Sequence, residues 1–213
     1  MRHTVFYGSG VLAVAAMAAA LLVWPIAGQA QLGGILPGGI LPGGTLPGTT
    51  TVLSGTGTLA AGTSDALQAS QLTGSISSLL TGEVLHAVTI GYPDQIDSEA
   101  SLASLSLNVA GTSIGADAVM ARAMAVAGGV VGTSNIDGLS INGVPVPVTG
   151  DPNQTIGIPG GVLVINEQQV SGDGTTVVNA LHAIVDGVAD VVVASATAGA
   201  SGGNAKAAQA TTF

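Results

Sequence analysis

The chain has 213 residues, which suits one domain of ordinary size. Only 7% of the residues are charged, and 3 Lys and Arg against 12 Asp and Glu give a net charge of −9. This balance argues against nucleic acid and anionic membrane surfaces as partners, because both attract clustered positive charge. The absence of Cys excludes disulfides, zinc–thiolate sites and thiol nucleophiles.

The first 30 residues have the pattern of a secretory signal peptide. Residues 1–3 include a positive charge, residues 11–23 are an unbroken apolar run, and Gly28-Gln29-Ala30 supplies the small residues that a signal peptidase recognises. We therefore expect cleavage between Ala30 and Gln31, and no membrane attachment after removal of the signal. The alternative is an uncleaved anchor helix, because the apolar stretch and its flanks reach the length needed to span a bilayer.

Residues 31–50 are predicted to form a Gly/Pro-rich spacer. Residues 33–47 contain three copies of a five-residue unit, GG[IT]LP. Each Pro-Gly pair suits the centre of a type II turn, because Pro fixes φ and Gly accepts the positive φ that follows. The repeat resembles elastin-like pentapeptides. We interpret it as a flexible linker, with a self-associating segment as the alternative.

Residues 51–203 have the pattern of an all-β domain, in which short apolar stretches alternate with Gly-containing turns. The clearest part is C-terminal, where residues 161–170, 175–186 and 191–198 are predicted as three strands. Asp173-Gly174 stands between the first two, and Asp-Gly between alternating runs is a strong hairpin signal. The pattern predicts a meander of three antiparallel strands within an antiparallel β-sandwich.

The upstream part of the domain contains further predicted strands. Leu105, Leu107 and Val109 alternate with small polar residues, as expected of a strand with one apolar face. Asn142-Gly143 indicates a turn before a segment whose prolines, Pro145 and Pro147, place it at a sheet edge. Three other segments complete the prediction: residues 84–90 and 116–127 as strands, and residues 64–72 as a short helix capped by Ser64.

The composition also predicts how the domain ends and how its core is built. Residues 204–213 are short and polar, and we expect a flexible tail there. The mature chain has only two aromatic residues, Tyr92 and Phe213. The core must therefore consist of Val, Leu, Ile, Ala and a few Met, which favours closely packed sheets with small side chains.

Several segments resemble the bacterial choice-of-anchor P family. They are residues 162–168 (VLVINEQ), 178–182 (VNALH) and 189–196 (ADVVVASA), with weaker similarity at 98–101 and 115–117. The resemblance covers roughly residues 76–203. It implies a secreted or surface-bound bacterial protein and supplies no catalytic residues. Residues 200–213 depart from the family because they contain neither an apolar tail nor a sortase motif, so free secretion becomes the simpler expectation.

One motif suggests a hydrolase. Residues 111–115 (GTSIG) fit G-x-S-x-G, the turn that exposes a nucleophilic serine between a strand and a helix, here Ser113. His182 follows in the chain order of an α/β-hydrolase. The rest of the chain lacks alternating strands and helices, however, and a Gly/Ser-rich sequence produces this motif by chance. We therefore expect no catalytic residues and no enzyme.

Two other sets of residues are candidates for binding. Asp94, Asp97 and Glu99 are close together in a predicted loop, and their oxygens could hold calcium. Strand alternation predicts that His182 shares a face with Val178, with Asn179 on the opposite face. A hydrogen-bonded histidine at the margin of the core is then the favoured interpretation, ahead of a base or a metal ligand.

These observations predict a non-catalytic secreted, cell-surface or extracellular-matrix protein. Its expected partners are other extracellular or envelope components, including further copies of itself. Two alternatives stay open: an extracellular binding module for calcium-dependent adhesion, carbohydrate or ice, and a serine hydrolase that uses Ser113. Cofactors other than calcium are not expected.

Overall fold

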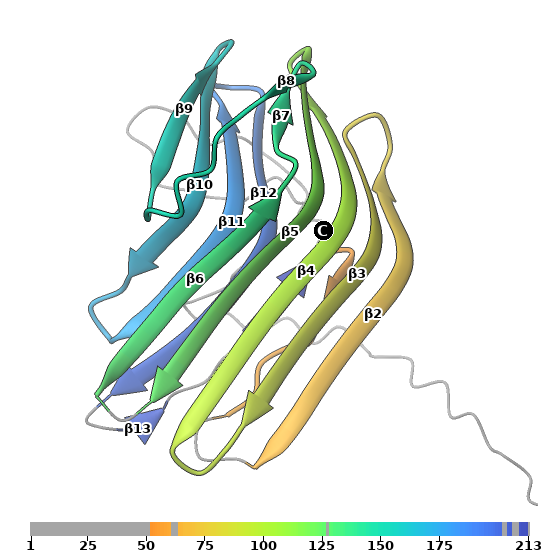
Figure 1. Ribbon diagram of the computed structural model, residues 1–213. Helices are drawn as coiled ribbons and strands as arrows, with labels where there is room; N and C mark the ends of the chain where they lie inside the picture. The colour runs from red at the N-terminus through yellow and green to blue at the C-terminus, as the bar shows by residue number, and fades with distance from the viewer. Residues whose placement is uncertain (1–51, 61–63, 127, 202–203, 206–208, 213) are drawn as a thin grey trace, which may run out of the picture.

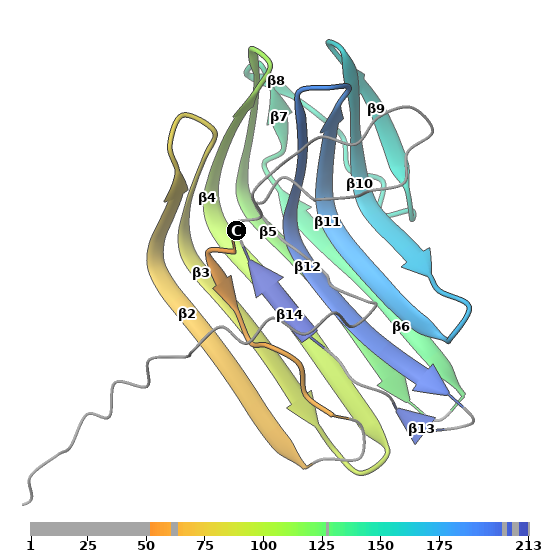
Figure 2. The same ribbon diagram turned by 180° about the vertical axis from the view of Figure 1, so that it is seen from behind.

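The computed structural model describes residues 52–60, 64–126, 128–201, 204–205 and 209–212. They form two seven-stranded antiparallel sheets that face each other as a sandwich, as predicted (Figure 1, Figure 2). The described residues contain no helix, and hence none that could cross a membrane. The predicted signal peptide, the Ala30/Gln31 cleavage site and the spacer lie outside the described residues.

The first sheet is built from residues 65–145. Its order is β2-β3-β4-β5-β7-β8, and β6 pairs with the other end of β5. The strands are β2 (Asp65–Ile76), β3 (Leu80–Gly91), β4 (Gln95–Val109), β5 (Thr112–Val126), β6 (Gly129–Asp137), β7 (Ser140–Ile141) and β8 (Val144–Pro145).

The second sheet joins the C-terminal strands to a short strand near the start of the described chain. Its order is β1-β14-β12-β11-β10-β9, with β13 also paired to β12. The strands are β1 (Ser54–Gly55), β9 (Gln154–Ile158), β10 (Gly161–Val170), β11 (Thr175–Val185), β12 (Ala189–Ser201), β13 (Asn204–Ala205) and β14 (Gln209–Thr212).

The core lies between the sheets and is aliphatic. Its buried hydrophobic residues are Leu, Ile, Val and Ala, with several fully enclosed leucines such as Leu85, Leu107 and Leu181. The expectation that methionines contribute is wrong for Met120 and Met124. They are half-buried on β5, whose neighbouring positions Val119, Ala121 and Ala123 supply the core. Packing small aliphatic side chains at high density replaces the missing aromatic rings.

The predicted strands are confirmed in most of the domain. The meander forms as β10, β11 and β12, and the turn at 171–174 is closed by hydrogen bonds between Ser171 and Thr175 and between Gly174 and Ser171. Gly174 has a φ of +83°, which a Gly adopts without strain. Residues 116–127 fall largely in β5, and the Asn142-Gly143 turn joins β7 to β8 at the edge of the sheet.

Two local predictions are wrong. The segment expected to be a helix, residues 64–72, lies in β2 from Asp65 onward, because pairing with β3 outweighs the weak helix propensity of its Ala, Gln and Leu residues. The tail expected to be flexible contains β13 and β14, and β14 pairs with both β12 and β1. This segment lacks a strong strand pattern of its own, so the partners available in the fold decide its conformation.

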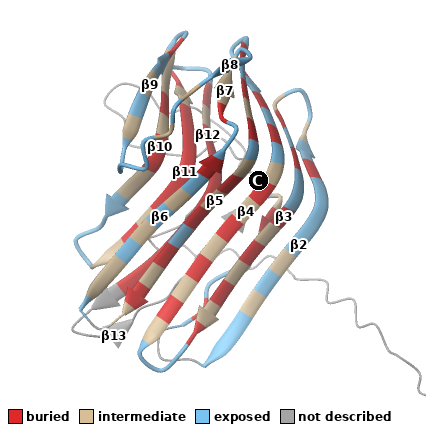
Figure 3. Ribbon diagram, viewed as in Figure 1, coloured by how far each residue is buried: buried red, intermediate tan, exposed pale blue. Residues whose placement is uncertain are grey.

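Side-chain alternation changes phase in the middle of the strands. In β4 the buried side chains stand at even positions from Ile96 to Leu102 and at odd positions from Leu105 to Val109. Ser104, between the two sets, has a φ of +51°. A residue in the left-handed region interrupts the alternation of a strand. The side chains that follow it therefore point to the other face of the sheet than uninterrupted alternation predicts. Figure 3 shows the alternation of buried and more exposed bands along β4.

Residues with positive φ also occur within neighbouring strands of both sheets. Val84 has a φ of +49° in β3, where the register with β4 is also irregular. In the second sheet, Asn166 on β10 has a φ of +52° and Ala194 on β12 has a φ of +56°. Both lie opposite Ala180 of β11, as the pairing of the residues before and after them shows. This phase change decides which side chains meet at the candidate site.

Candidate functional site

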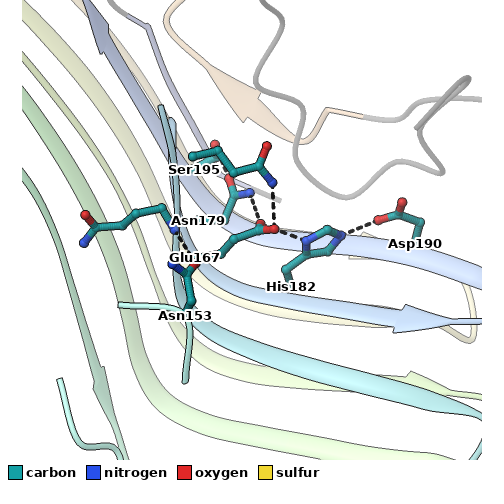
Figure 4. A network of polar contacts seen from close by, with 8 residues as sticks. Asn153, Glu167, Asn179, His182, Asp190 and Ser195 are labelled. Carbon is teal, nitrogen blue, oxygen red and sulfur yellow. Dashed lines mark hydrogen bonds and ion pairs between the residues drawn. The ribbon is translucent and has the colours of Figure 1, made fainter. Parts of the chain in front are cut away.

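The candidate site is a buried polar cluster on three strands of the second sheet. Glu167 lies on β10, Asn179 and His182 on β11, and Asp190 and Ser195 on β12. Figure 4 shows the His182 ring between the carboxylates of Glu167 and Asp190, with Asn179 and Ser195 continuing the network from Glu167. We call these five residues the His182 cluster.

Both nitrogens of the His182 ring are engaged. Nδ1 lies 2.8 Å from Oε2 of Glu167, and Nε2 lies 2.6 Å from Oδ1 of Asp190. The three side chains are only 9%, 12% and 16% exposed for His182, Glu167 and Asp190. Contacts of this length between ionised groups away from water are the strong kind of hydrogen bond.

The Glu167 carboxylate accepts two further hydrogen bonds. Asn179 donates through Nδ2 to Oε2 at 2.6 Å, and Gln169 donates through Nε2 to Oε1 at 2.7 Å. The amide oxygen of Asn179 in turn accepts the Ser195 hydroxyl at 2.7 Å. The cluster thus satisfies its own donors and acceptors, which is the condition for keeping charged groups in a protein interior.

The surroundings shift the pKa values of the charged pair in opposite directions. Burial by itself lowers the pKa of His182, but the hydrogen bonds to Asp190 and Glu167 and the charges of both carboxylates outweigh it and raise that pKa to about 9. Burial by itself raises the pKa of Glu167, and hydrogen bonds from His182 and Asn179, with the positive charge on the ring, lower it overall. At neutral pH the cluster therefore holds an imidazolium between carboxylates.

This arrangement limits the chemistry that His182 can perform. A general base needs a free ring nitrogen, and a metal ligand needs a neutral imidazole with one nitrogen free for the metal. His182 has neither, since both nitrogens donate to carboxylates. The cluster links three adjacent strands through charged hydrogen bonds, which is a structural role.

The predicted positions of His182 and Asn179 are corrected by this geometry. Residues three apart on an evenly alternating strand lie on opposite faces, yet Asn179 and His182 both contact the same oxygen of Glu167. The alternation therefore changes phase in β11 too, at the level where Asn166 on β10 and Ala194 on β12 have positive φ. Val178, which was expected beside His182, instead faces the first sheet, where its side chain packs closely against Gly132.

Ser113 does not occupy a nucleophile elbow. Its motif begins in the tight turn between β4 and β5, where Ala110 and Gly111 both have positive φ, and continues into β5 rather than into a helix. The backbone N–H of Ser113 donates to Oδ1 of Asn142 at 2.9 Å. Ser113 thus belongs to the first sheet, whereas His182 belongs to the second.

The three proposed calcium ligands are not brought together. Asp97 and Glu99 are in β4 rather than in a loop, and Asp94 lies in the preceding turn. Arg122 on β5 binds both carboxylate oxygens of Asp97, with Nε 2.9 Å from Oδ1. Within the ranges that the structure describes, no three His, Asp or Glu side chains form a group that could hold a metal ion.

Glu167 and Asp190 are not among the site residues predicted from the sequence. The hairpin turn at 171–174 sets the register that places Glu167 opposite Asn179, so this pair could have been found from the turn alone. The contact of Glu167 with His182 could not have been predicted from the turn, because it depends on the change of alternation beside Asn166 and Ala194.

Comparison with protein-family models, with curated proteins and with solved structures finds no match. The resemblance to the choice-of-anchor P family therefore stays a prediction.

Proposed function

We propose that this protein is a non-catalytic exported protein whose β-sandwich acts as a structural module at the cell surface or in the extracellular matrix. The observation that carries the non-catalytic part is the His182 cluster. In this cluster, within the described residues, a histidine, two carboxylates, an amide and a hydroxyl lie together, and they form hydrogen bonds with one another. Groups engaged in this way are not available for a substrate.

Export is supported by the sequence. The apolar run at 11–23 and the small residues at 28–30 fit a signal peptide, and the absence of Cys with few charges is compatible with a module that needs neither redox control nor charged partners. The resemblance to the choice-of-anchor P family points to the same location.

Cell fractionation with N-terminal sequencing tests export. We expect the protein in the medium or the envelope fraction, with Gln31 as its first residue. Ala30→Arg should block cleavage and retain the longer form, because it removes one of the two small residues that the peptidase recognises. The matched change Gln31→Arg leaves Gly28 and Ala30 in place and should still be cleaved. A protein found only in the cytoplasm with an intact N-terminus would contradict the proposal.

A fluorophosphonate probe tests the absence of serine hydrolase chemistry. We expect no labelling of the wild-type protein. Labelling that disappears in Ser113→Ala and persists in the neighbouring variant Ser106→Ala would establish Ser113 as a nucleophile and overturn the non-catalytic assignment.

A further inference from the structure

Among the described residues, the outer edge of β2 has no partner strand. β2 pairs with β3 along its whole length, from Asp65 opposite Gly91 to Ile76 opposite Leu80. On its other side, no strand of the described residues pairs with it. A strand in this position presents a row of free N–H and C=O groups that can pair with another chain.

Other edges of the two sheets are protected. β8 has two residues and includes Pro145, and β9 has five residues and is followed by Pro159. The edge of β6 is partly capped, because Nε2 of Gln168 donates to the carbonyl oxygen of Gly132 at 3.0 Å. Short length, proline and capping side chains are the usual means of preventing edge-to-edge pairing.

Within the part of the chain that the structure describes, β2 has none of these protections. Its 12 residues, DALQASQLTGSI, contain no proline and no basic residue, and its one charge, Asp65, is at its first position. None of them has a positive φ that would twist the edge away. β2 is therefore long, free of proline and nearly uncharged.

Apolar side chains on β2 and on the neighbouring β3 would gain cover from an added strand. Leu72 is 79% exposed, and Val84, at the facing position of β3, is 59% exposed. On the inner face, Leu67 and Ile76 are partly buried and pack at the margin of the core. An added strand would extend the sheet over both groups.

We propose that β2 pairs in antiparallel orientation with β2 of a second copy, so that two sandwiches share one continuous sheet. A symmetric dimer needs a surface that complements itself. With the two-fold axis near Ser70 and Gln71, the two Asp65 carboxylates lie at opposite ends of the interface, and amide and hydroxyl side chains meet across it. The protein has a net charge of −9, so two copies repel each other. Only one of its 12 acidic residues is on β2, and the repulsion is therefore weak at this edge.

Sedimentation velocity of the purified protein over a range of concentrations tests this dimer. We expect a concentration-dependent dimer in the wild type. Gln68→Lys/Gln71→Lys places like charges near the two-fold axis and should weaken association by at least about tenfold. It should still unfold in one cooperative thermal transition, which shows that the sandwich is folded. The control, Val144→Lys/Val170→Lys, changes the net charge equally at two exposed positions elsewhere and should leave association intact.

A charge-complementation experiment provides the second arm. Gln68→Glu/Gln71→Glu should also be monomeric, and mixing it with the Lys variant should restore a dimer that contains one copy of each. A wild type that sediments as a monomer up to its solubility limit would overturn the proposal, as would equal weakening by the control variant. The dimer does not depend on export, so its failure would leave the proposed location unaffected.

Discussion

Nε2 of His182 lies 2.6 Å from Oδ1 of Asp190, across the β11–β12 pair. The register places Val192 directly opposite His182, so Asp190 reaches the ring diagonally from two positions away. Glu167 holds the other ring nitrogen from β10. One imidazolium thus ties three adjacent strands together, and its protonation becomes linked to the stability of the second sheet.

This linkage predicts that the protein loses stability in mildly alkaline solution. The pKa of His182 is about 9 in the fold, against 6.5 in an unfolded chain, so folding favours the protonated ring. The stabilisation is complete below pH 6.5 and is lost as the pH rises through 9. Urea titrations should show the free energy of unfolding falling by up to about 3 kcal/mol over this interval.

The two described histidines allow a matched control for the pH dependence. His182→Gln should flatten the profile between pH 6.5 and 9. His86→Gln should keep the wild-type slope, because the side-chain hydrogen bond of His86 within the described residues is to the uncharged hydroxyl of Ser70. An unchanged slope in His182→Gln would show that the ring is not the titrating group.

Removing the charge of Glu167 should destabilise the protein strongly. Glu167→Gln places an amide where a carboxylate accepts hydrogen bonds from His182, Asn179 and Gln169, and it leaves the imidazolium with one anionic partner. We expect a loss of about 3 kcal/mol at pH 7 by chemical denaturation. The control is Asp97→Asn, which breaks the more exposed ion pair with Arg122 and should cost less than about 1 kcal/mol. Equal losses would contradict the distinction between the two ion pairs.

Two neighbouring glycines should differ in their tolerance of Ala. A methyl group at Gly161 would overlap the backbone carbonyl of Ile184 on β11, whereas one at Gly157 on β9 would meet open space. Because backbone cannot move aside cheaply, we expect Gly161→Ala to lower stability by about 3 kcal/mol or more, and Gly157→Ala to change it by less than about 1 kcal/mol. Differential scanning calorimetry measures both, and a tolerated Gly161→Ala would show that β10 and β11 are less closely paired than described.

Relieving the backbone strain at Val84 should stabilise the protein. A β-branched residue at a φ of +49° is unfavourable, and the Val84 side chain is largely exposed and gains little from packing. Relief of strain of roughly 1–3 kcal/mol is partly offset by the greater entropy that Gly gives the unfolded chain, about 1 kcal/mol, so we expect Val84→Gly to raise the free energy of unfolding by up to about 1 kcal/mol. Val88→Gly, at a position of the same strand with ordinary φ, should lower it by a similar amount. Destabilisation by both substitutions would indicate that Val84 contributes packing that outweighs its strain.

The fold class and the C-terminal meander follow from the amino-acid pattern alone. Alternating aliphatic residues and Gly-containing turns leave few alternatives to antiparallel strands, and Asp173-Gly174 also sets the register of β10 against β11. Pro145 predicts that its segment lies at a sheet edge, because proline donates no backbone hydrogen bond to a neighbouring strand. β8 is indeed the last strand in the order of its sheet.

Which side chains meet depends on the assembled sheets. Residues 65–72 lack a strong preference for helix or strand, and pairing with β3 makes them a strand. The His182 cluster depends on left-handed residues at Asn166 and Ala194, which do not alter the apolar pattern in an obvious way. Such a change of phase arises because neighbouring strands distort together to keep their hydrogen bonds, so it belongs to the sheet as a whole and not to any one strand.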